Sequence, residues 1–178
     1  MNKLSLLLPL VFCFVISCQD KQAMADLEEC RNMERILELN KEIVREVMSA
    51  LDKNDFDKLS ELFSNDFGLK VPGLEIPIKK EDVFQAIKTH YASFPDWTHN
   101  IEDMIAEGDR VVVNVMQIGT HKEQYQGISA TGKKITNPAI HIMTIVDGQV
   151  KDWSGIEDNL GMMQQLGMEL QMKEETKE

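Results

Sequence analysis

Two histidines occupy positions from which their imidazole rings could act on the same ligand. His121 and His141 fall on neighbouring predicted strands, so both side chains could face the interior of the fold. The alternative is a structural or surface role for each, because a shift of one residue in strand register moves a side chain to the opposite face. No third residue with metal-ligand spacing accompanies the pair, so we expect no metal site.

Large aromatic and thioether side chains could line an apolar cavity. The aromatic candidates are Tyr91, Phe94, Trp97 and Trp153. Eleven methionines against two tyrosines indicate an adaptable interior, because the thioether side chain is flexible and polarizable. At helix and strand spacing these residues are also compatible with an ordinary core, and the sequence leaves both interpretations open.

The composition is typical of a single globular domain with appendages. Of the 178 residues, 43% are apolar and 28% are charged, which excludes a disordered chain and a multi-span membrane protein. The 30 acidic and 19 basic side chains give a net charge of −11. This excess excludes a nucleic-acid binder, whose affinity for phosphates depends on clustered Lys and Arg.

The first 18 residues, MNKLSLLLPLVFCFVISC, predict a lipoprotein signal peptide. An early cation precedes an apolar run that is too short to span a bilayer comfortably. The run ends in Val15-Ile16-Ser17-Cys18, which resembles the bacterial lipobox, a motif whose cysteine is acylated and becomes the new N-terminus. The alternative is an ordinary secreted protein in which Cys18 is a free thiol.

These observations predict four segments. We expect residues 1–17 to be the signal peptide, 18–34 a lipidated polar tether, 35–172 the folded domain and 173–178 a charged tail. Two or three acyl chains anchor a protein stably, so we expect the domain to be held at a membrane of the cell envelope, on the periplasmic or outer-membrane side.

Helical periodicity predicts three helices in the first half of the domain. Apolar residues recur at helical spacing from about 34 to 52, over 56–63 and over 83–94, where Pro95 ends the pattern. The segment 64–79 contains Pro72, Gly73 and Pro77, which predict an irregular chain with one short strand.

Beyond Pro95 the apolar period changes to two. It predicts strands over 97–106, 110–125, 135–146 and 150–156, and Asp147-Gly148 is typical of a hairpin turn. Asp158 is a good N-cap for a last helix over 159–166, which Gly167 ends. Helices followed by an antiparallel meander predict an α+β fold.

Six short segments form a recognisable set between about Ile36 and Leu170. They are Phe94-Pro95-Asp96-Trp97, Glu107-Gly108-Asp109-Arg110-Val111, Gly119-Thr120-His121, Gly127-Ile128-Ser129-Ala130-Thr131-Gly132-Lys133, Asp147-Gly148 and Gln165-Leu166-Gly167. As a set they resemble the SnoaL-like polyketide cyclase (ester cyclase) family. The resemblance implies the nuclear transport factor 2-like cone, in which N-terminal helices pack on a curved, mainly antiparallel sheet and a short helix ends the chain.

The resemblance also implies a homodimer formed through the sheet, no metal and no organic cofactor. In cyclases of this family a pocket aspartate acts as general acid and base while an intramolecular aldol condensation closes a polyketide ring. The aspartate follows a tryptophan and precedes the last helix, which points to Asp158 here. His121, His141 and Asn137 are then candidates to stabilise the enolate oxygen.

One spacing departs from the pattern of the family. Asp158 follows Trp153 by five residues where four are expected, so either a bulge intervenes or Glu157 takes the aligned place. Asp158 could also cap the helix only, or line the pocket without moving a proton. Three functions stay open: acid/base chemistry (aldol cyclisation or isomerisation) on a small apolar carbonyl compound, non-catalytic binding of an apolar small molecule by an envelope lipoprotein, and a protein-interaction role for the open sheet.

Overall fold

The computed structural model describes the backbone of residues 7–71 and 73–171, and the side chains of 21–71 and 73–171. The chain divides into two compact units, Met1–Leu39 and Asn40–Glu178. The predicted charged tail, 173–178, and the side chain of Cys18 lie outside the described residues. In the described part of the chain, no helix combines the length and the apolar composition that crossing a membrane requires.

A single long helix, α1 (Leu7–Asp52), includes the segment predicted to be a polar tether. Neither Gly nor Pro occurs between residues 10 and 52, and Ala, Leu, Glu, Gln, Lys and Met have high helix propensity. The side chains of residues 21–36 are all exposed, so this part of the helix is polar without a buried face. The predicted end of the helix near residue 52 is confirmed.

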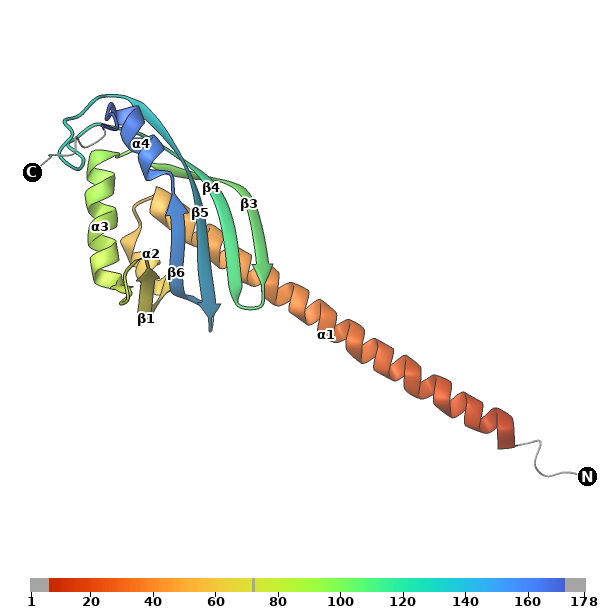
Figure 1. The fold of residues 1–178 in the computed structure, drawn as a ribbon. Helices are drawn as coiled ribbons and strands as arrows, with labels where there is room; N and C mark the ends of the chain where they lie inside the picture. The colour runs from red at the N-terminus through yellow and green to blue at the C-terminus, as the bar shows by residue number, and fades with distance from the viewer. Residues whose placement is uncertain (1–6, 72, 172–178) are drawn as a thin grey trace, which may run out of the picture. The chain divides into compact units, whose positions relative to one another are not determined.

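The second unit is built on one six-stranded sheet with the order β2-β1-β6-β5-β4-β3 (Figure 1). The strands are β1 (Phe63–Lys70), β2 (Ile78–Lys79), β3 (Thr98–Glu107), β4 (Arg110–Thr120), β5 (Lys134–Val146) and β6 (Gln149–Glu157). All neighbours are antiparallel except β1 and β6, which run parallel. The mainly antiparallel α+β architecture predicted from the sequence is confirmed.

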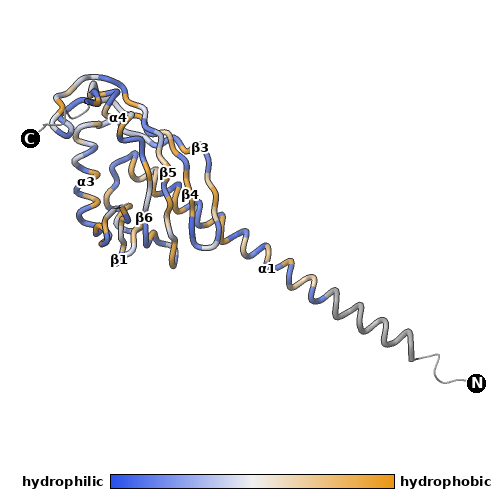
Figure 2. The backbone as a smooth tube through the Cα atoms, viewed as in Figure 1, coloured by the Kyte–Doolittle hydropathy of each residue, from blue (hydrophilic) through white to orange (hydrophobic). Residues whose placement is uncertain are grey.

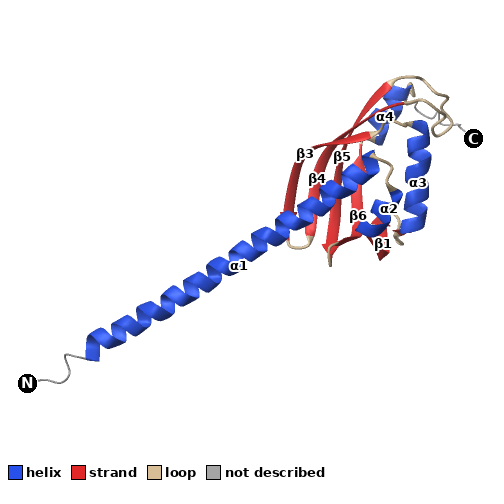
Figure 3. Cartoon of the chain, turned by 180° about the vertical axis from the view of Figure 1, so that it is seen from behind, coloured by secondary structure: helices blue, strands red, loops and turns tan. Residues whose placement is uncertain are grey.

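Three further helices complete this unit: α2 (Phe56–Leu62), α3 (Lys80–Ser93) and α4 (Asn159–Leu166). Seen from behind, α2, α3 and residues 40–52 of α1 lie on one face of the sheet (Figure 3). Their buried residues form one core with that inner face, in which Val47, Leu59 and Val113 are fully buried. The bounds predicted for α4 match the structure.

Apolar and polar residues follow one another along the strands, as the hydropathy colouring shows (Figure 2). On β4 the inward residues Val111, Val113 and Val115 are inaccessible to solvent. Asp147 and Gly148 both have positive φ, 49° and 77°, which a type I′ turn between β5 and β6 requires. A register shift between Ile145–Val150 and Thr144–Asp152 follows this turn, and beyond it the pairing decides which residues of β6 face inward.

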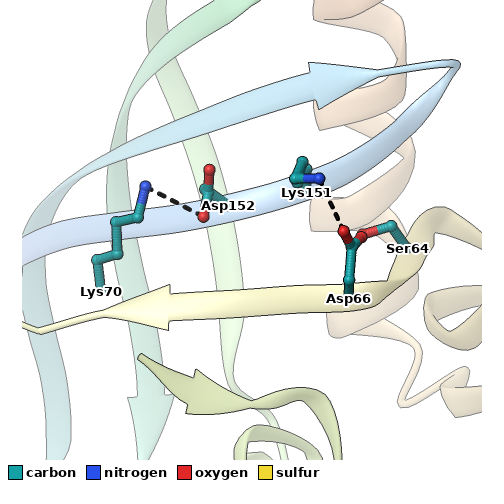
Figure 4. A network of polar contacts seen from close by, with 5 residues as sticks. All are labelled: Ser64, Asp66, Lys70, Lys151 and Asp152. Carbon is teal, nitrogen blue, oxygen red and sulfur yellow. Dashed lines mark hydrogen bonds and ion pairs between the residues drawn. The ribbon is translucent and has the colours of Figure 1, made fainter. Parts of the chain in front are cut away.

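The strands β1 and β2 occupy the segment for which the sequence predicted only one short strand. Ion pairs support the parallel pairing of β1 with β6: Lys70 Nζ lies 3.1 Å from Asp152 Oδ1, and Lys151 Nζ lies 2.7 Å from Asp66 Oδ2 (Figure 4). The Ser64 hydroxyl donates a hydrogen bond of 2.9 Å to Asp66. Because the charged groups are largely exposed, these pairs add little to the stability of the fold.

Candidate active site

A cavity of about 810 Å³ opens between α3 and the inner face of the sheet. Its wall is formed by the end of α1, by α3, by residues of all six strands, by the first residue of α4 and by the loop that follows β4. Cavities of roughly 300–1,000 Å³ are typical of small-molecule sites. The polar side chains in this wall are therefore the candidates for chemistry.

The carboxylate of Glu157 lies in the cavity wall because of the pairing between β5 and β6. Met143 pairs with Trp153, His141 with Gly155 and Ala139 with Glu157, without a bulge between these pairs. Alternate residues of a strand share a face, so Trp153, Gly155 and Glu157 all point inward. Trp153 and Glu157 are four residues apart, which is the spacing expected of the catalytic carboxylate.

One amide, Gln117, interacts with this carboxylate, and a second amide, Asn137, holds Gln117. Asn137 Nδ2 donates a hydrogen bond of 3.1 Å to Gln117 Oε1, which leaves the Gln117 amide nitrogen as its remaining donor group. Gln117 hydrogen-bonds to Glu157. Both amides are buried, with 3% of Gln117 and 1% of Asn137 exposed. The chain of donors from Asn137 through Gln117 thus orients Glu157.

Desolvation raises the pKa of Glu157 above its ordinary value. The Gln117 hydrogen bond and the electrostatic interaction with His99 oppose this shift, and desolvation outweighs both. More than a third of the surface of Glu157 stays accessible, and the residue lines the cavity. A carboxylate of raised pKa is a stronger base than an ordinary surface carboxylate.

His141 faces the same cavity from β5. It is 3% exposed, its ring packs edge-on against Trp153 at 5.2 Å, and its Nε2 has no hydrogen-bond partner. Burial, assisted by the charge of His99, lowers the pKa of His141 to about 4. The ring is therefore neutral at pH 7. Gly155 makes room for it, since a Cβ there would lie 2.6 Å from His141 Nδ1.

Further polar and aromatic groups complete the wall on the α3 side. His90 stacks on Phe94 at 4.9 Å and meets Trp97 edge-on at 4.6 Å, and its Nε2 also lacks a partner. Burial lowers the pKa of His90 to about 4 and raises that of the Tyr91 hydroxyl, which is likewise unpartnered. Trp97 lies across Gly119, where any Cβ would overlap the indole ring.

A histidine–aspartate pair lies at the β3 side of the cavity. His99, on β3, lines the cavity, and its Nδ1 lies 2.7 Å from Asp52 Oδ1 at the end of α1. The backbone N–H of His99 donates a second hydrogen bond, of 3.0 Å, to the same oxygen. A carboxylate can only accept, so Nδ1 carries the proton.

Of the predicted catalytic residues, Asp158 lies outside the cavity wall. Asp158 is the N-cap of α4, where its carboxylate accepts a 2.8 Å hydrogen bond from the Gly161 N–H, and it is not among the residues that line the cavity. Asp158 follows the last residue of β6 and begins the turn into α4. The geometry thus favours the second alternative left open by the sequence, with Glu157 in the aligned place.

His121 lies beyond the end of β4, outside the cavity wall. It is fully buried, stacks on Phe94 at 5.1 Å, and its Nδ1 is within 3.1 Å of the Thr131 hydroxyl and accepts a hydrogen bond of 3.2 Å from the Thr131 N–H. These contacts tie the loop after β4 to the core. The structure thus separates His121 from His141, which the sequence had placed together.

Some of the predicted pocket residues line the cavity and others do not. Tyr91, Trp97 and Trp153 line the cavity, whereas Phe94 and Asn137 are buried behind its wall. Phe94 supports the ring of His90, and Asn137 acts through Gln117. Among the described residues, no group of three or more His, Cys, Asp or Glu side chains is arranged to hold a metal ion.

Sequence reasoning did not single out Gln117 or the pair of Asp52 with His99. Gln117 carries a usable signal, because it is a polar residue at an inward position of an otherwise apolar strand. The pair carries none, since its two members are 47 residues apart and belong to different predicted elements.

Comparison with known proteins identifies the family. The sequence profile described as "SnoaL-like polyketide cyclase" matches residues 41–166. The chain belongs to this family. Two relatives are aklanonic acid methyl ester cyclases, DauD from Streptomyces sp. (strain C5) and DnrD from Streptomyces peucetius. Each is 29% identical over 131 residues, which make up 71% of this chain and 80% and 89% of the two relatives.

Solved structures of SnoaL-like and related proteins share the fold. IdmH from Streptomyces antibioticus is 26% identical, with a TM-score of 0.66 over 72% of this chain and 99% of its own. AclR from Streptomyces galilaeus, at 20% identity and a TM-score of 0.69, covers 74% of this chain and 97% of its own and shows the likeness of fold alone. The nuclear transport factor 2-like architecture expected from the sequence is thus confirmed.

Proposed function

We propose that this SnoaL-like protein binds an oxygenated, mostly apolar carbonyl compound in its cavity and closes a ring in it by an intramolecular aldol condensation. Glu157 is the general base, and the chain's own side chains, rather than a cofactor, supply the chemistry. The observation that carries the proposal is the desolvated Glu157 carboxylate, held by Gln117 in the wall of an 810 Å³ cavity.

The proposed reaction begins when Glu157 removes a proton from the carbon beside a carbonyl group. Removal of this proton leaves negative charge on the enolate oxygen, which needs a hydrogen-bond donor within reach. His141 meets this need, because it is neutral, faces the cavity and has a ring nitrogen without a partner. The enolate carbon then attacks a second carbonyl of the same molecule, and the new alkoxide takes up a proton.

Unpartnered polar atoms around the cavity support a substrate with several oxygens. His90 Nε2, the Tyr91 hydroxyl and His141 Nε2 are buried without hydrogen-bond partners, a state that costs about 1–3 kcal/mol for each group. Ligand oxygens in the cavity would satisfy these groups, while Trp97 and Trp153 would contact its apolar surface. A polyketide-type carbonyl ester combines these two properties.

The test uses two probes with the full-length protein. Methyl acetoacetate in D₂O reports proton removal alone, as deuterium incorporation at the carbon between its carbonyls, followed by NMR. Aklanonic acid methyl ester, the compound in the names of the two relatives, reports ring closure. The proposal expects both signals above the buffer background, whereas tight binding of the ester with neither signal would establish the non-catalytic binding protein instead.

The outer face of the sheet supports a homodimer, which we propose as the assembled form. Ile105 and Ile140 project from this face and are 62% and 50% exposed. Aliphatic side chains gathered on an open sheet are typical of a surface that is covered in the assembled protein.

We propose further that Cys18 is acylated and that the protein is held at a membrane of the cell envelope. The support is the sequence Val15-Ile16-Ser17-Cys18 after an apolar run. Labelled palmitate should enter the wild-type protein and not the Cys18→Ala variant. Equal labelling of the two proteins, or of neither, would contradict acylation at this cysteine.

A further inference from the structure

The pair of His99 with Asp52 stands out among the polar groups of the cavity. His99 lines the cavity with 6% of its side chain exposed, and Asp52 accepts hydrogen bonds from both its ring Nδ1 and its backbone N–H. With Nδ1 engaged, Nε2 is the ring nitrogen left to meet a ligand. The other two cavity histidines differ, because His90 and His141 are held neutral and have a buried Nε2 without a partner.

The sheet places His99 and Glu157 on either side of one amide. His99 on β3 pairs with Gln117 on β4, and Gln117 hydrogen-bonds to Glu157 on β6. The charge of His99 also acts on the ionisation of Glu157, His90 and His141, so it lies within electrostatic reach of all three. A ligand beside Gln117 thus has a carboxylate on one side and an imidazole on the other.

We propose that His99, oriented by Asp52, is the general acid that protonates the new hydroxyl oxygen during ring closure. The inference rests on the proposed aldol function, which assigns the base but leaves the proton donor unnamed. A carboxylate bound to Nδ1–H orients an imidazole and stabilises its protonated form, so that Nε2 can donate a proton across the ring. His99 is then a catalytic residue, and Asp52 is a positioning residue.

The proton inventory of the step balances. Glu157 takes a proton from carbon, and the carbanion electron pair forms the new carbon–carbon bond. The electron pair of the acceptor carbonyl moves to its oxygen, which takes the proton from His99 Nε2. Glu157 ends protonated and His99 neutral, and transfer of one proton between them, directly or through solvent, restores the starting state. No oxidant, reductant or co-reactant is needed.

The two half-reactions separate this role from that of the base. His99→Asn retains a side-chain N–H that can donate to Asp52, but it has no proton to give to the product. We expect it to slow ring closure of aklanonic acid methyl ester by about 100-fold or more and to slow deuterium exchange into methyl acetoacetate far less, since Glu157 still removes the proton. Asp52→Asn should slow ring closure by about 10-fold and should also slow exchange less than closure.

Asp66→Asn is the matched control, because it removes an ion-paired aspartate far from the cavity wall and should leave both rates unchanged. A thermal unfolding curve of each variant separates a catalytic effect from loss of the tie between α1 and β3. Loss of exchange together with closure, or closure at the wild-type rate in His99→Asn, would overturn the inference alone. Wild-type protein that catalyses neither reaction would overturn the proposed function, and the inference with it.

Discussion

The inner and outer faces of the sheet differ in where they carry their polar groups. The inner face, which packs against helices, holds Gln117, Asn137, His141 and Glu157 among its apolar residues. The outer face, which is open, exposes aliphatic residues such as Ile140. A half-buried sheet is ordinarily apolar inside and polar outside, and most of this sheet follows that pattern, with Val111, Val113 and Val115 buried on the inner face. The exceptions on each face agree with the two proposals made above, ligand chemistry at the polar groups inside and pairing of two copies at the aliphatic groups outside.

A substitution of His141 separates function from stability on the inner face. His141→Leu removes the proposed enolate donor, and we expect deuterium exchange to fall by about 100-fold, the usual cost of one such donor. Its free energy of unfolding should fall by no more than about 1 kcal/mol, because the substitution also removes a buried nitrogen without a partner. Denaturant unfolding and the exchange assay on the same sample measure both quantities.

The opposite result would reassign His141. If the variant lost several kcal/mol of stability while the remaining folded protein exchanged deuterium normally, His141 would be a core residue rather than a part of the site.

A charge on the outer face tests whether this face pairs two copies of the chain. Ile140→Glu places a carboxylate at the centre of the exposed aliphatic patch, and we expect the molar mass in light scattering to fall from two chains to one. Thr136→Glu, at an exposed position two pairs along β5, is the matched control and should keep the two-chain mass. A wild-type mass of one chain would show that the outer face does not pair two copies.

The pH dependence of the free energy of unfolding tests whether the buried histidines of the cavity stay neutral in the folded protein. The pKa of His90 and of His141 falls from 6.5 to about 4 on folding, so between these values the unfolded chain binds more protons. The free energy of unfolding must therefore decrease as the pH falls from about 6.5 towards 4. At pH 5 the loss is roughly 2 kcal/mol for each histidine.

Urea unfolding at pH 7 and pH 5 measures this loss. The variants His90→Asn and His141→Asn should each have a smaller difference between the two pH values than wild type. An unchanged difference in both variants would mean that the two rings accept protons in the folded protein.

Local signals predicted most of the fold, and long-range pairing explains what they missed. The bounds of α4 and the Asp147-Gly148 turn follow from residues within a few positions of each other. The strand β1 does not, because it contains Asn65, Asp66 and Gly68 and gains its pairing from β6, more than 80 residues further along. Its sequence alone lacks a clear strand pattern.

The residues of the candidate site could be predicted where alternation along a strand determines which side chains face inward. They could not be predicted where contacts between distant elements bring the residues together. Trp153, Gly155 and Glu157 share one face by simple alternation, which accounts for Asp158 leaving the cavity to cap α4. Alternation assigns the same inward orientation to His121 and His141. They are separated along the strands, because His141 pairs with Val113 whereas His121 follows the end of β4. The pairing of Asp52 with His99 depends on the packing of α1 against β3, for which no local pattern exists.

The central claim is that Glu157, and not its neighbour Asp158, removes the proton. Deuterium exchange into methyl acetoacetate, compared among wild type, Glu157→Gln and Asp158→Asn, tests it most directly. Glu157→Gln keeps the shape and hydrogen bonding of the side chain but cannot act as a base, so we expect exchange to fall by about 10²–10⁴-fold. Asp158→Asn keeps the helix cap and should exchange within about twofold of wild type. Loss of exchange in Asp158→Asn with retention in Glu157→Gln would contradict the account.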